Sequence, residues 1–151
     1  MPPEELPPIG LGTLWYETPA ECVENVETAL EMGYRHLDTA QKYENEREVG
    51  EAIERSPVPR EDVFLATKVA ESNLAYDDVI ETAHASLDRL GVDAVDMLYV
   101  HWPAVTYDAE ETLSAFNELL EEGAMRYVGL GNVTPDLFEE ALDILDEPPL
   151  A

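Results

Sequence analysis

The stretch DVFLATKVAESNLAYDDVIETAHASLDRLGVDAVDMLYVH, residues 62–101, decides the fold. The apolar runs over 62–69 and 94–100 are short enough for strands, and their near-continuous apolar character favours burial on both faces. Between them, residues 77–90 repeat apolar side chains at helical spacing and stop at Gly91, which suits the left-handed end of a helix. The stretch therefore predicts a strand, a helix and a strand, the repeating unit of a parallel α/β sheet.

The same alternation continues on both sides of this stretch. We expect five strands, near residues 9–13, 34–38, 62–69, 94–100 and 125–131. Helices are expected from Thr18, Glu46, Asp77, Asp108 and Thr134 onward, and the last one carries Leu137, Phe138, Ala141, Leu142 and Leu145. The first helix begins with a capping box, in which Thr18 is the cap, Pro19 takes the first turn and Glu21 completes the box. No linker interrupts the pattern, so we expect residues 1–151 to form a single domain.

A polar residue stands at the carboxyl end of four successive strands, namely Asp38, Lys68, His101 and Asn132. They lie 30, 33 and 31 residues apart, and a period of about 30 residues is one βα unit. Equal units with polar ends favour a TIM-type (β/α)8 barrel, whose active site lies on the carboxyl rim of its strands. The rival fold, a doubly wound open sheet, usually has a glycine-rich phosphate turn, and Gly10-Leu11-Gly12-Thr13 is not followed by the last glycine of that motif.

The charge balance excludes several kinds of partner. The chain has 34 acidic and 8 basic residues, for a net charge of −26. A protein that binds nucleic acid or an anionic membrane would carry the opposite sign. An acid-rich, lysine-poor surface is typical of a protein that works in high salt, where screening removes self-repulsion. The alternative is a merely acidic protein, and we favour the halophilic interpretation because Lys42 and Lys68 are the only lysines.

The remaining composition indicates a cytoplasmic protein. Cys22 is the only cysteine, so neither a disulfide framework nor a cysteine-based metal site is expected. No apolar run approaches the length of a membrane span, and no signal peptide opens the chain. The three histidines, His36, His84 and His101, lack the spacing of metal ligands, so we expect no metal. The oligomeric state is left open.

Four side chains would meet on the predicted rim: Asp38, Tyr43, Lys68 and His101. Taken singly, each has an ordinary explanation as a turn former, a packing residue or a surface ion pair. Taken together, they suit carbonyl reduction, because a buried Lys68 needs the counter-charge of Asp38 and a tyrosine beside an ammonium has a lowered pKa. Tyr43 is then a competent general acid, and His101 can donate to the carbonyl oxygen. The set lacks a reductant, so a nicotinamide cofactor is expected.

Several segments also resemble the aldo-keto reductase family, in the family's order. GYRHLDTAQKYENEREVG (33–50) resembles the signature with the catalytic Asp and Tyr, and VPREDVFLATKV (58–69) resembles the strand with the catalytic Lys. SLDRLGVDAVDMLYVHWP (86–103) resembles the second signature, which ends in the His. GLGTLW (10–15) resembles the first strand, and ETLSAFNELLEEGAMRYVGLGN (111–132) the segment that leads to the cofactor's carboxamide site.

The resemblance implies a role for each matching residue. Tyr43 is the proton donor, Lys68 lowers its pKa, and Asp38 holds Lys68. The family's cofactor-binding positions fall on Thr13, Asp38 and Asn132, and its substrate-binding positions on Trp15, His101 and Trp102. The implied cofactor is NADPH, with NADH as the alternative, and the implied substrate is a small aldehyde or ketone.

Two departures from the family pattern stand out. Gly131 occupies a position where the family usually has Ser, which removes one hydrogen bond to the cofactor, worth about 1 kcal/mol. Five strands also fall short of the eight that close a barrel, so the sheet is expected to be truncated and to expose two edges. Two alternatives to an active reductase therefore stay open: a non-catalytic NADP(H)-binding regulatory protein, and an inactive truncated barrel that needs a partner.

Overall fold

The computed structural model describes residues 6–151. Its strands are β1 (Leu11–Gly12), β2 (His36–Asp38), β3 (Phe64–Val69), β4 (Val95–Val100) and β5 (Met125–Leu130). Its α-helices are α1 (Pro19–Glu31), α2 (Glu46–Arg55), α3 (Tyr76–Leu90), α4 (Ala109–Glu122) and α5 (Pro135–Ile144). There are also two 3-10 turns. The turn η1 (Gln41–Tyr43) follows β2, and the turn η2 (Arg60–Asp62) precedes β3. Over this part of the chain, no helix is both long enough and apolar enough to cross a membrane.

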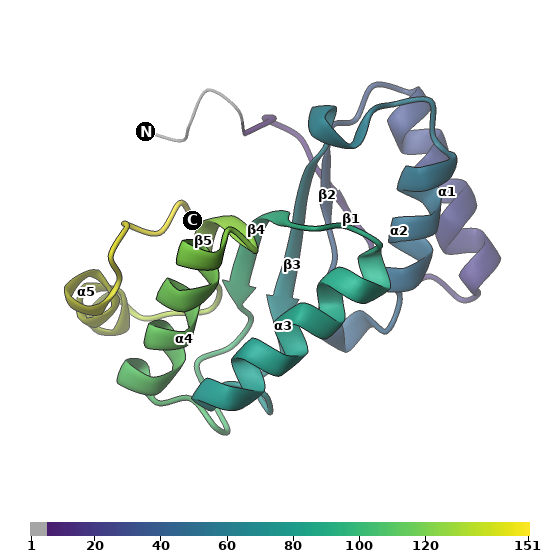
Figure 1. Ribbon diagram of the computed structural model, residues 1–151. Helices are drawn as coiled ribbons and strands as arrows, with labels where there is room; N and C mark the ends of the chain where they lie inside the picture. The colour runs from purple at the N-terminus through teal and green to yellow at the C-terminus, as the bar shows by residue number, and fades with distance from the viewer. Residues whose placement is uncertain (1–5) are drawn as a thin grey trace.

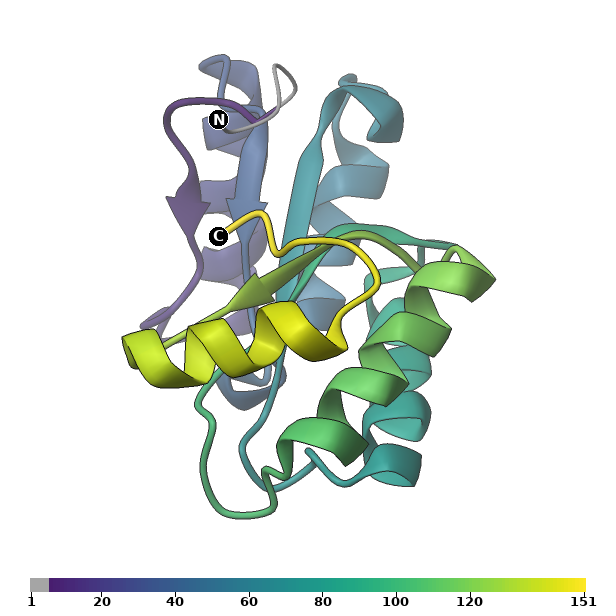
Figure 2. The same cartoon turned by 90° about the vertical axis from the view of Figure 1, so that its left-hand side faces the viewer.

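The order of the strands distinguishes the two candidate folds. All neighbouring strands are parallel, and their order in the sheet, β1-β2-β3-β4-β5, is their order in the chain. A doubly wound sheet would reverse its strand order at a switch point, whereas here every crossover leads to the next strand, as in a barrel. Figures 1 and 2 show α1 to α4 together on one side of this sheet. The predicted fold class is confirmed: the chain forms five units of a (β/α)8 barrel.

Apolar side chains fill two layers, one on each side of the sheet. The main core lies between the sheet and the helices and includes Leu37, Leu65, Leu98 and Phe116. A smaller cluster on the other side contains Phe64, Ala66 and Met97, with Tyr99, Tyr127 and Leu150 packed against it. Successive residues of β3 thus point to opposite sides, as strand geometry requires. The predicted burial of β3 on both faces is confirmed.

The helix starts follow the predicted caps, with one change. The Thr18 hydroxyl accepts a hydrogen bond from the Glu21 N–H (3.2 Å), and Asp108 and Thr134 cap α4 and α5 in the same way. The Glu21 carboxylate, however, accepts a hydrogen bond from the Glu17 N–H (2.9 Å), one residue before the cap. The reciprocal bond of the predicted capping box is therefore shifted by one residue.

Three strands, β1, β2 and β3, begin about two residues later than the sequence predicts, and a preceding turn explains the delay in β2 and β3. β2 starts at His36 because the N–H of Tyr34 still bonds to the carbonyl of Ala29 (2.9 Å) at the end of α1. β3 starts at Phe64 because Asp62 belongs to the turn η2. In both places the chain completes a preceding turn before it joins the sheet.

The apolar face of α5 is only partly buried. Ala141 and Leu145 are enclosed, whereas Phe138 and Leu142 are exposed, because the main neighbour of α5 is α4 alone. The tail beyond α5 lies along β5: the Leu150 N–H donates to the Val128 carbonyl (2.8 Å), and the Leu130 N–H to the Ala151 carbonyl (2.7 Å). Figure 2 shows this tail returning to the sheet. The expected exposed edge at β5 is therefore partly covered, since the tail pairs with part of it.

Candidate active site

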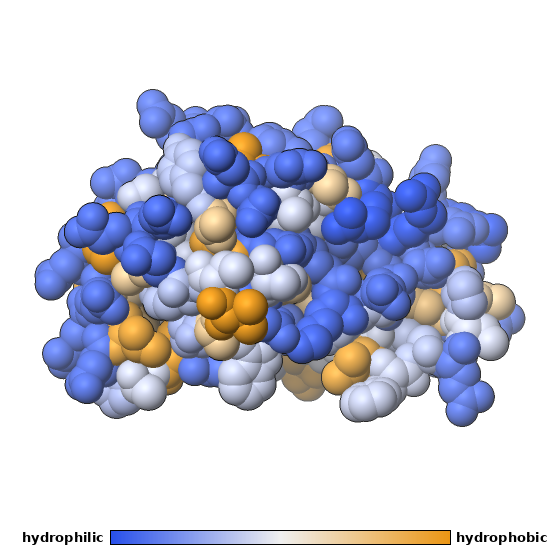
Figure 3. Space-filling view, turned by 90° about the horizontal axis from the view of Figure 1, so that it is seen from below, coloured by the Kyte–Doolittle hydropathy of each residue, from blue (hydrophilic) through white to orange (hydrophobic). Residues whose placement is uncertain are grey.

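The carboxyl ends of the strands bring the predicted residues to one rim. Asp38 pairs with Ala66, two residues before Lys68, and Lys68 pairs with Tyr99, two residues before His101. Residues paired across parallel strands point to the same face, so Asp38 and Lys68 share the face turned away from the helices. The rim faces downward in Figure 1. Figure 3 shows it from below as a mostly hydrophilic surface with separate hydrophobic residues.

Lys68 is the centre of the cluster. Its ammonium contacts the Asp38 carboxylate, donates to the carbonyl of Thr39 (2.9 Å) and lies 3.4 Å from the phenol oxygen of Tyr43. The Lys68 side chain is only 13% exposed. A charge this enclosed requires a counter-charge, and Asp38 provides it, as the sequence indicated.

Tyr43 is held between this ammonium and the histidine. The Lys68 nitrogen lies 5.0 Å from the centroid of the Tyr43 ring. The same ring meets His101 edge to face, with 5.8 Å between centroids and 81° between planes. The Tyr43 phenol therefore lies between the Lys68 ammonium and the His101 imidazole on the rim.

His101 begins the loop after β4, where its N–H donates to the carbonyl of Val69 (3.2 Å). Burial lowers the pKa of His101 from its usual value, and the charge of Lys68 lowers it further. The imidazole is therefore neutral near pH 7 and carries one N–H. Its Nδ1 is buried and has no partner among residues 6–151, which leaves Nε2 as the nitrogen available to a ligand.

Asn132 joins the rim from β5. Its backbone is left-handed (φ 59°), and its side-chain NH2 group donates to the carbonyl of His101 (2.8 Å). Gly131 makes this possible, because a Cβ there would lie 2.7 Å from the His101 carbonyl oxygen and 3.0 Å from that of Val100. The departure from the family's serine thus has a local reason: a side chain would push the two strand ends apart.

The other predicted site residues are Thr13, Trp15 and Trp102. Thr13 is fully buried, its hydroxyl 3.2 Å from the Asp38 carbonyl and its own carbonyl bound by the side chain of Asn45 (2.7 Å). Its predicted contact with a cofactor stays a prediction. Trp15 and Trp102 are exposed on the loops after β1 and β4, by 87% and 48%. Their predicted role in a substrate pocket likewise stays a prediction.

Tyr99 is a neighbour of Lys68 that the sequence reasoning missed. Its ring centroid lies 5.7 Å from the Lys68 nitrogen, on the same strand face. Burial, and then the charge of Asp38, raises the pKa of Tyr99 to about 12, which makes it a poor proton donor. The sequence did contain a signal for this: Tyr99 lies two residues before His101 on the same strand, and residues two apart on a strand point to the same face.

Backbone strain collects on the same rim. Within residues 6–151, the non-glycine residues with positive φ are Trp15, Glu44, Val105 and Asn132. Each lies in a loop that follows a strand. Val105 is the most unusual, because a β-branched side chain rarely adopts this conformation. Such strain is typical of ligand-binding sites, and no sequence pattern predicted it here.

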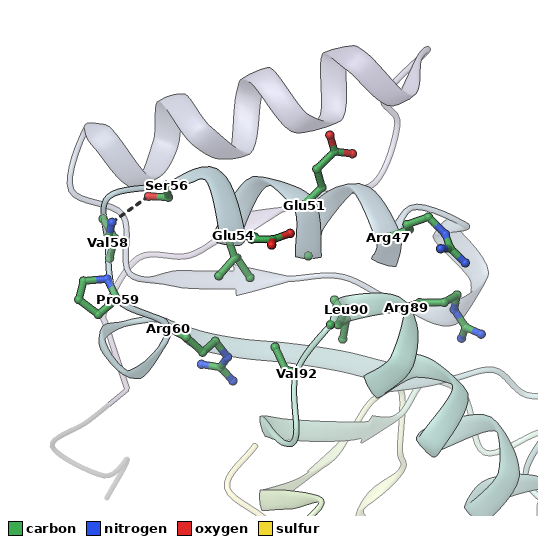
Figure 4. A pocket seen from close by; sticks show the side chains of 13 residues that line it. Arg47, Glu51, Glu54, Ser56, Val58, Pro59, Arg60, Arg89, Leu90 and Val92 are labelled. Atoms are coloured by element: carbon green, nitrogen blue, oxygen red, sulfur yellow. Dashed lines mark hydrogen bonds between the residues drawn. The ribbon is translucent and has the colours of Figure 1, made fainter.

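A separate groove of about 650 Å³ lies between α2 and α3 and extends to the segments that lead into β3 and β4 (Figure 4). Arg47, Arg60 and Arg89 line it. Arg60 is paired with Asp96 and Arg89 with Glu46, so two of its three cations are already neutralised. Because barrel enzymes place their chemistry at the carboxyl rim, that rim is the candidate active site. No cluster of residues able to hold a metal ion occurs in the described part of the chain.

Comparison with known proteins adds independent evidence. The Aldo/keto reductase family matches residues 8–150. An aldo-keto reductase of Mycolicibacterium smegmatis is 44% identical over 133 residues, which cover 87% of this chain and 48% of that protein. Methylglyoxal reductase DkgB of Escherichia coli is 40% identical over 139 residues, which cover 91% of this chain and 52% of that protein.

Solved structures agree with the sequence matches. An aldo-keto reductase from a Medee basin deep-sea metagenome library superposes with a TM-score of 0.90 at 38% identity, over 95% of this chain and 53% of that one. A Bombyx mori aldo-keto reductase in complex with NADP superposes with a TM-score of 0.88 at 30% identity, over 96% and 53%.

The fold and the rim define a parallel βα barrel protein with a polar site at the ends of its strands. Within that class, the chain belongs to the aldo/keto reductase family. It spans about half the length of the curated relatives it matches.

Proposed function

We propose that the protein reduces a small aldehyde or ketone to an alcohol with NADPH, and that Tyr43 is the proton donor. The observation that carries this proposal is the contact of Lys68 with both Asp38 and Tyr43 on the carboxyl rim. The relatives support it, since one is named a methylglyoxal reductase and another binds NADP.

Proton transfer is the task of Tyr43. As hydride adds to the carbonyl carbon, the carbonyl oxygen gains negative charge and takes the proton of the phenol. The Lys68 ammonium then stabilises the phenolate, and Asp38 holds that ammonium in place. His101, neutral near pH 7, donates its Nε2–H to the same carbonyl oxygen and orients the substrate.

Asn132 is proposed to hold the nicotinamide end of the cofactor on the rim. NADPH supplies the hydride when it is bound. Asn132 is exposed, and because its NH2 group is used by His101, its side-chain oxygen is left as an acceptor for a carboxamide N–H. The rim residues thus fit the nicotinamide end. Preference for NADPH over NADH depends on residues that bind the phosphate on the adenosine of NADPH. We propose NADPH because solved structures of relatives contain NADP or NADPH.

The high-salt and cytoplasmic setting is also part of the proposal. An excess of 34 acids over 8 bases supports work at high ionic strength and disfavours nucleic acid and anionic membranes as partners. The buried, unpaired Cys22 suits a reducing compartment.

Substitution of Tyr43 tests the mechanism. Tyr43→Phe removes the proton donor and is expected to lower the rate of NADPH consumption with an aldehyde by about 10²–10⁴-fold, the usual contribution of a general acid. Tyr99→Phe is the matched control, because it removes the other hydroxyl beside Lys68 and is expected to keep most of the activity.

Two results would contradict the proposal. Unchanged activity in Tyr43→Phe would exclude Tyr43 as the donor. Tight NADPH binding without turnover across a panel of aldehydes would favour the non-catalytic alternative, which fluorescence titration of the cofactor would show.

A further inference from the structure

We propose that Gln41 is a positioning residue, which holds the turn of Tyr43 at the distance from Lys68 that proton donation needs. This inference rests on the proposed role of Tyr43 and extends it to a side chain that touches neither substrate nor cofactor. The geometry around the Gln41 amide carries it.

The Gln41 amide uses all of its hydrogen-bonding capacity. Its oxygen accepts from the backbone N–H of Ala70 (3.0 Å) and from the side-chain NH2 of Asn73 (3.0 Å). Its nitrogen donates to the carbonyl of Thr82 (3.2 Å) and to the hydroxyl of Ser86 (3.3 Å). Two acceptor sites and two N–H groups are the full inventory of such an amide.

The orientation of this amide is determined by its partners. Ala70 offers only an N–H, and Thr82 offers only a carbonyl oxygen. A flipped amide would place donor against donor at Ala70 and acceptor against acceptor at Thr82. Gln41 therefore joins the loop after β3 to helix α3 in a single arrangement.

Gln41 is also the first residue of the turn η1, which ends in Tyr43. Within η1, the Tyr43 N–H bonds to the Ala40 carbonyl (3.0 Å), and the Glu44 N–H bonds to the Gln41 carbonyl (3.2 Å). Any displacement of Gln41 is thus transmitted through one short turn to Tyr43.

The segment that Gln41 binds through Ala70 is also the one that carries the Lys68 ammonium. Ala70 follows Lys68 by two residues, so the bond from Ala70 to Gln41 ties the Tyr43 turn to the strand of Lys68. The neighbouring contact between Lys42 and Glu71 runs in parallel, but Lys42 is 56% exposed and adds little restraint. Together with the bonds of Thr39 to the Ala66 carbonyl (2.9 Å) and from the Lys68 ammonium (2.9 Å), Gln41 holds the Tyr43–Lys68 distance at 3.4 Å.

The test compares two amide clamps in the 151-residue chain. Gln41→Leu removes all four bonds while keeping a side chain of similar size. Asn117→Leu is the matched control, since Asn117 joins α4 to the end of α5 by two bonds, to the Ile144 carbonyl (3.0 Å) and from the Asp146 N–H (3.1 Å), far from the rim. Gln41→Leu is expected to lower kcat by up to about 100-fold, because misplacement of reacting groups has costs of that size, with little change in the KM for NADPH.

A second measurement does not depend on turnover. In a chain with labelled tyrosine, NMR contacts between the Tyr43 ring and the Lys68 side chain are expected to persist in Asn117→Leu and to vanish in Gln41→Leu. The Tyr43 signals are identified by their absence in Tyr43→Phe. Gln41→Glu, which keeps the acceptor side of the clamp, is expected to recover part of both kcat and the contacts.

The outcomes separate the inference from the function on which it rests. Equal losses of kcat in Gln41→Leu and Asn117→Leu, or unchanged Tyr43–Lys68 contacts in Gln41→Leu, would overturn the role of Gln41. An unaltered chain that binds NADPH but reduces no aldehyde would refute the proposed function, and the NMR comparison alone would then decide whether Gln41 holds Tyr43.

Discussion

Lys68 shows how much a single side chain does in this site. It is one of two lysines in a chain with 34 acids, and it contacts a carboxylate, a backbone carbonyl and a phenol at once. An arginine would carry the same charge, but its planar guanidinium is larger and cannot occupy a point between three oxygens. The presence of a lysine here, in a chain that is otherwise poor in lysine, indicates that this position requires a compact ammonium.

Cys22 provides a test of the packing at the residue scale. Its side chain is 1% exposed on the inner face of α1, and burial raises the pKa of its thiol to about 11. We expect the folded protein to react negligibly with a thiol reagent in mildly alkaline solution, because the thiolate is the reactive form. In denaturant, one thiol per chain is expected to react at once. Rapid labelling of the native protein would contradict the predicted burial of α1.

At the scale of elements, α2 and α3 are joined more tightly than two surface helices need to be. A Cβ at Gly50 would lie 2.2 Å from the Leu90 carbonyl oxygen, so the helices meet backbone to backbone. Beside this contact, the Glu46 carboxylate binds Arg89 of α3 (2.7 Å) and the hydroxyl of Thr67 in β3 (2.5 Å). This buried network lies directly behind the strand that carries Lys68, and it links α2, α3 and β3.

Two ion pairs of α2 allow a matched test of this network. Glu46 is 1% exposed, so Arg89→Leu leaves a buried carboxylate without its cation and is expected to lower the free energy of unfolding by about 3 kcal/mol. Arg55→Leu breaks the pair of Arg55 and Glu51, whose side chains are both exposed, and is expected to cost less than about 1 kcal/mol. Urea denaturation measures both. Losses of similar size would show that Glu46 is not buried as described.

At the scale of the molecule, charge is the dominant feature. The acids lie largely on the outer surfaces of the helices, as Glu24 and Glu31 do on α1, while the core beneath them is apolar. With a net charge of −26, self-repulsion opposes the compact state wherever the charges are poorly screened. Screening extends over about 10 Å at 0.1 M salt and about 3 Å at 1 M, so repulsion between neighbouring helices fades at molar salt.

The stability of the protein is therefore expected to increase with salt. Thermal unfolding followed by circular dichroism should give a Tm that rises steeply between dilute buffer and molar KCl. Glu24→Gln combined with Glu31→Gln is expected to flatten this dependence, because it removes two of the repelling charges. A Tm that is indifferent to KCl, or that responds equally to sucrose, would argue for a merely acidic protein.

Much of this molecule follows from local sequence signals. Helix caps such as Thr18 and Asp108, glycines at helix ends, and apolar periodicity act over a few residues, so the sequence determined the elements and their order. The regular period then placed Asp38, Lys68 and His101 on one rim, because parallel strands end at the same edge of a sheet. The boundaries of β2 and β3 were less accurate, since the turns before them are completed by contacts that leave no periodic pattern.

Only the tertiary structure decided how the rim is held. The partners of Gln41 lie 29 to 45 residues away in the chain, and the close approach that requires Gly131 involves carbonyls of a neighbouring strand. Such contacts depend on how α3 packs against η1 and how β4 lies beside β5, and neither is a local property of the residues concerned. The sequence by itself predicted that Asp38, Lys68 and His101 end neighbouring strands at one rim. The packing of distant elements determined the distance between Tyr43 and Lys68 on which the proposed proton transfer depends.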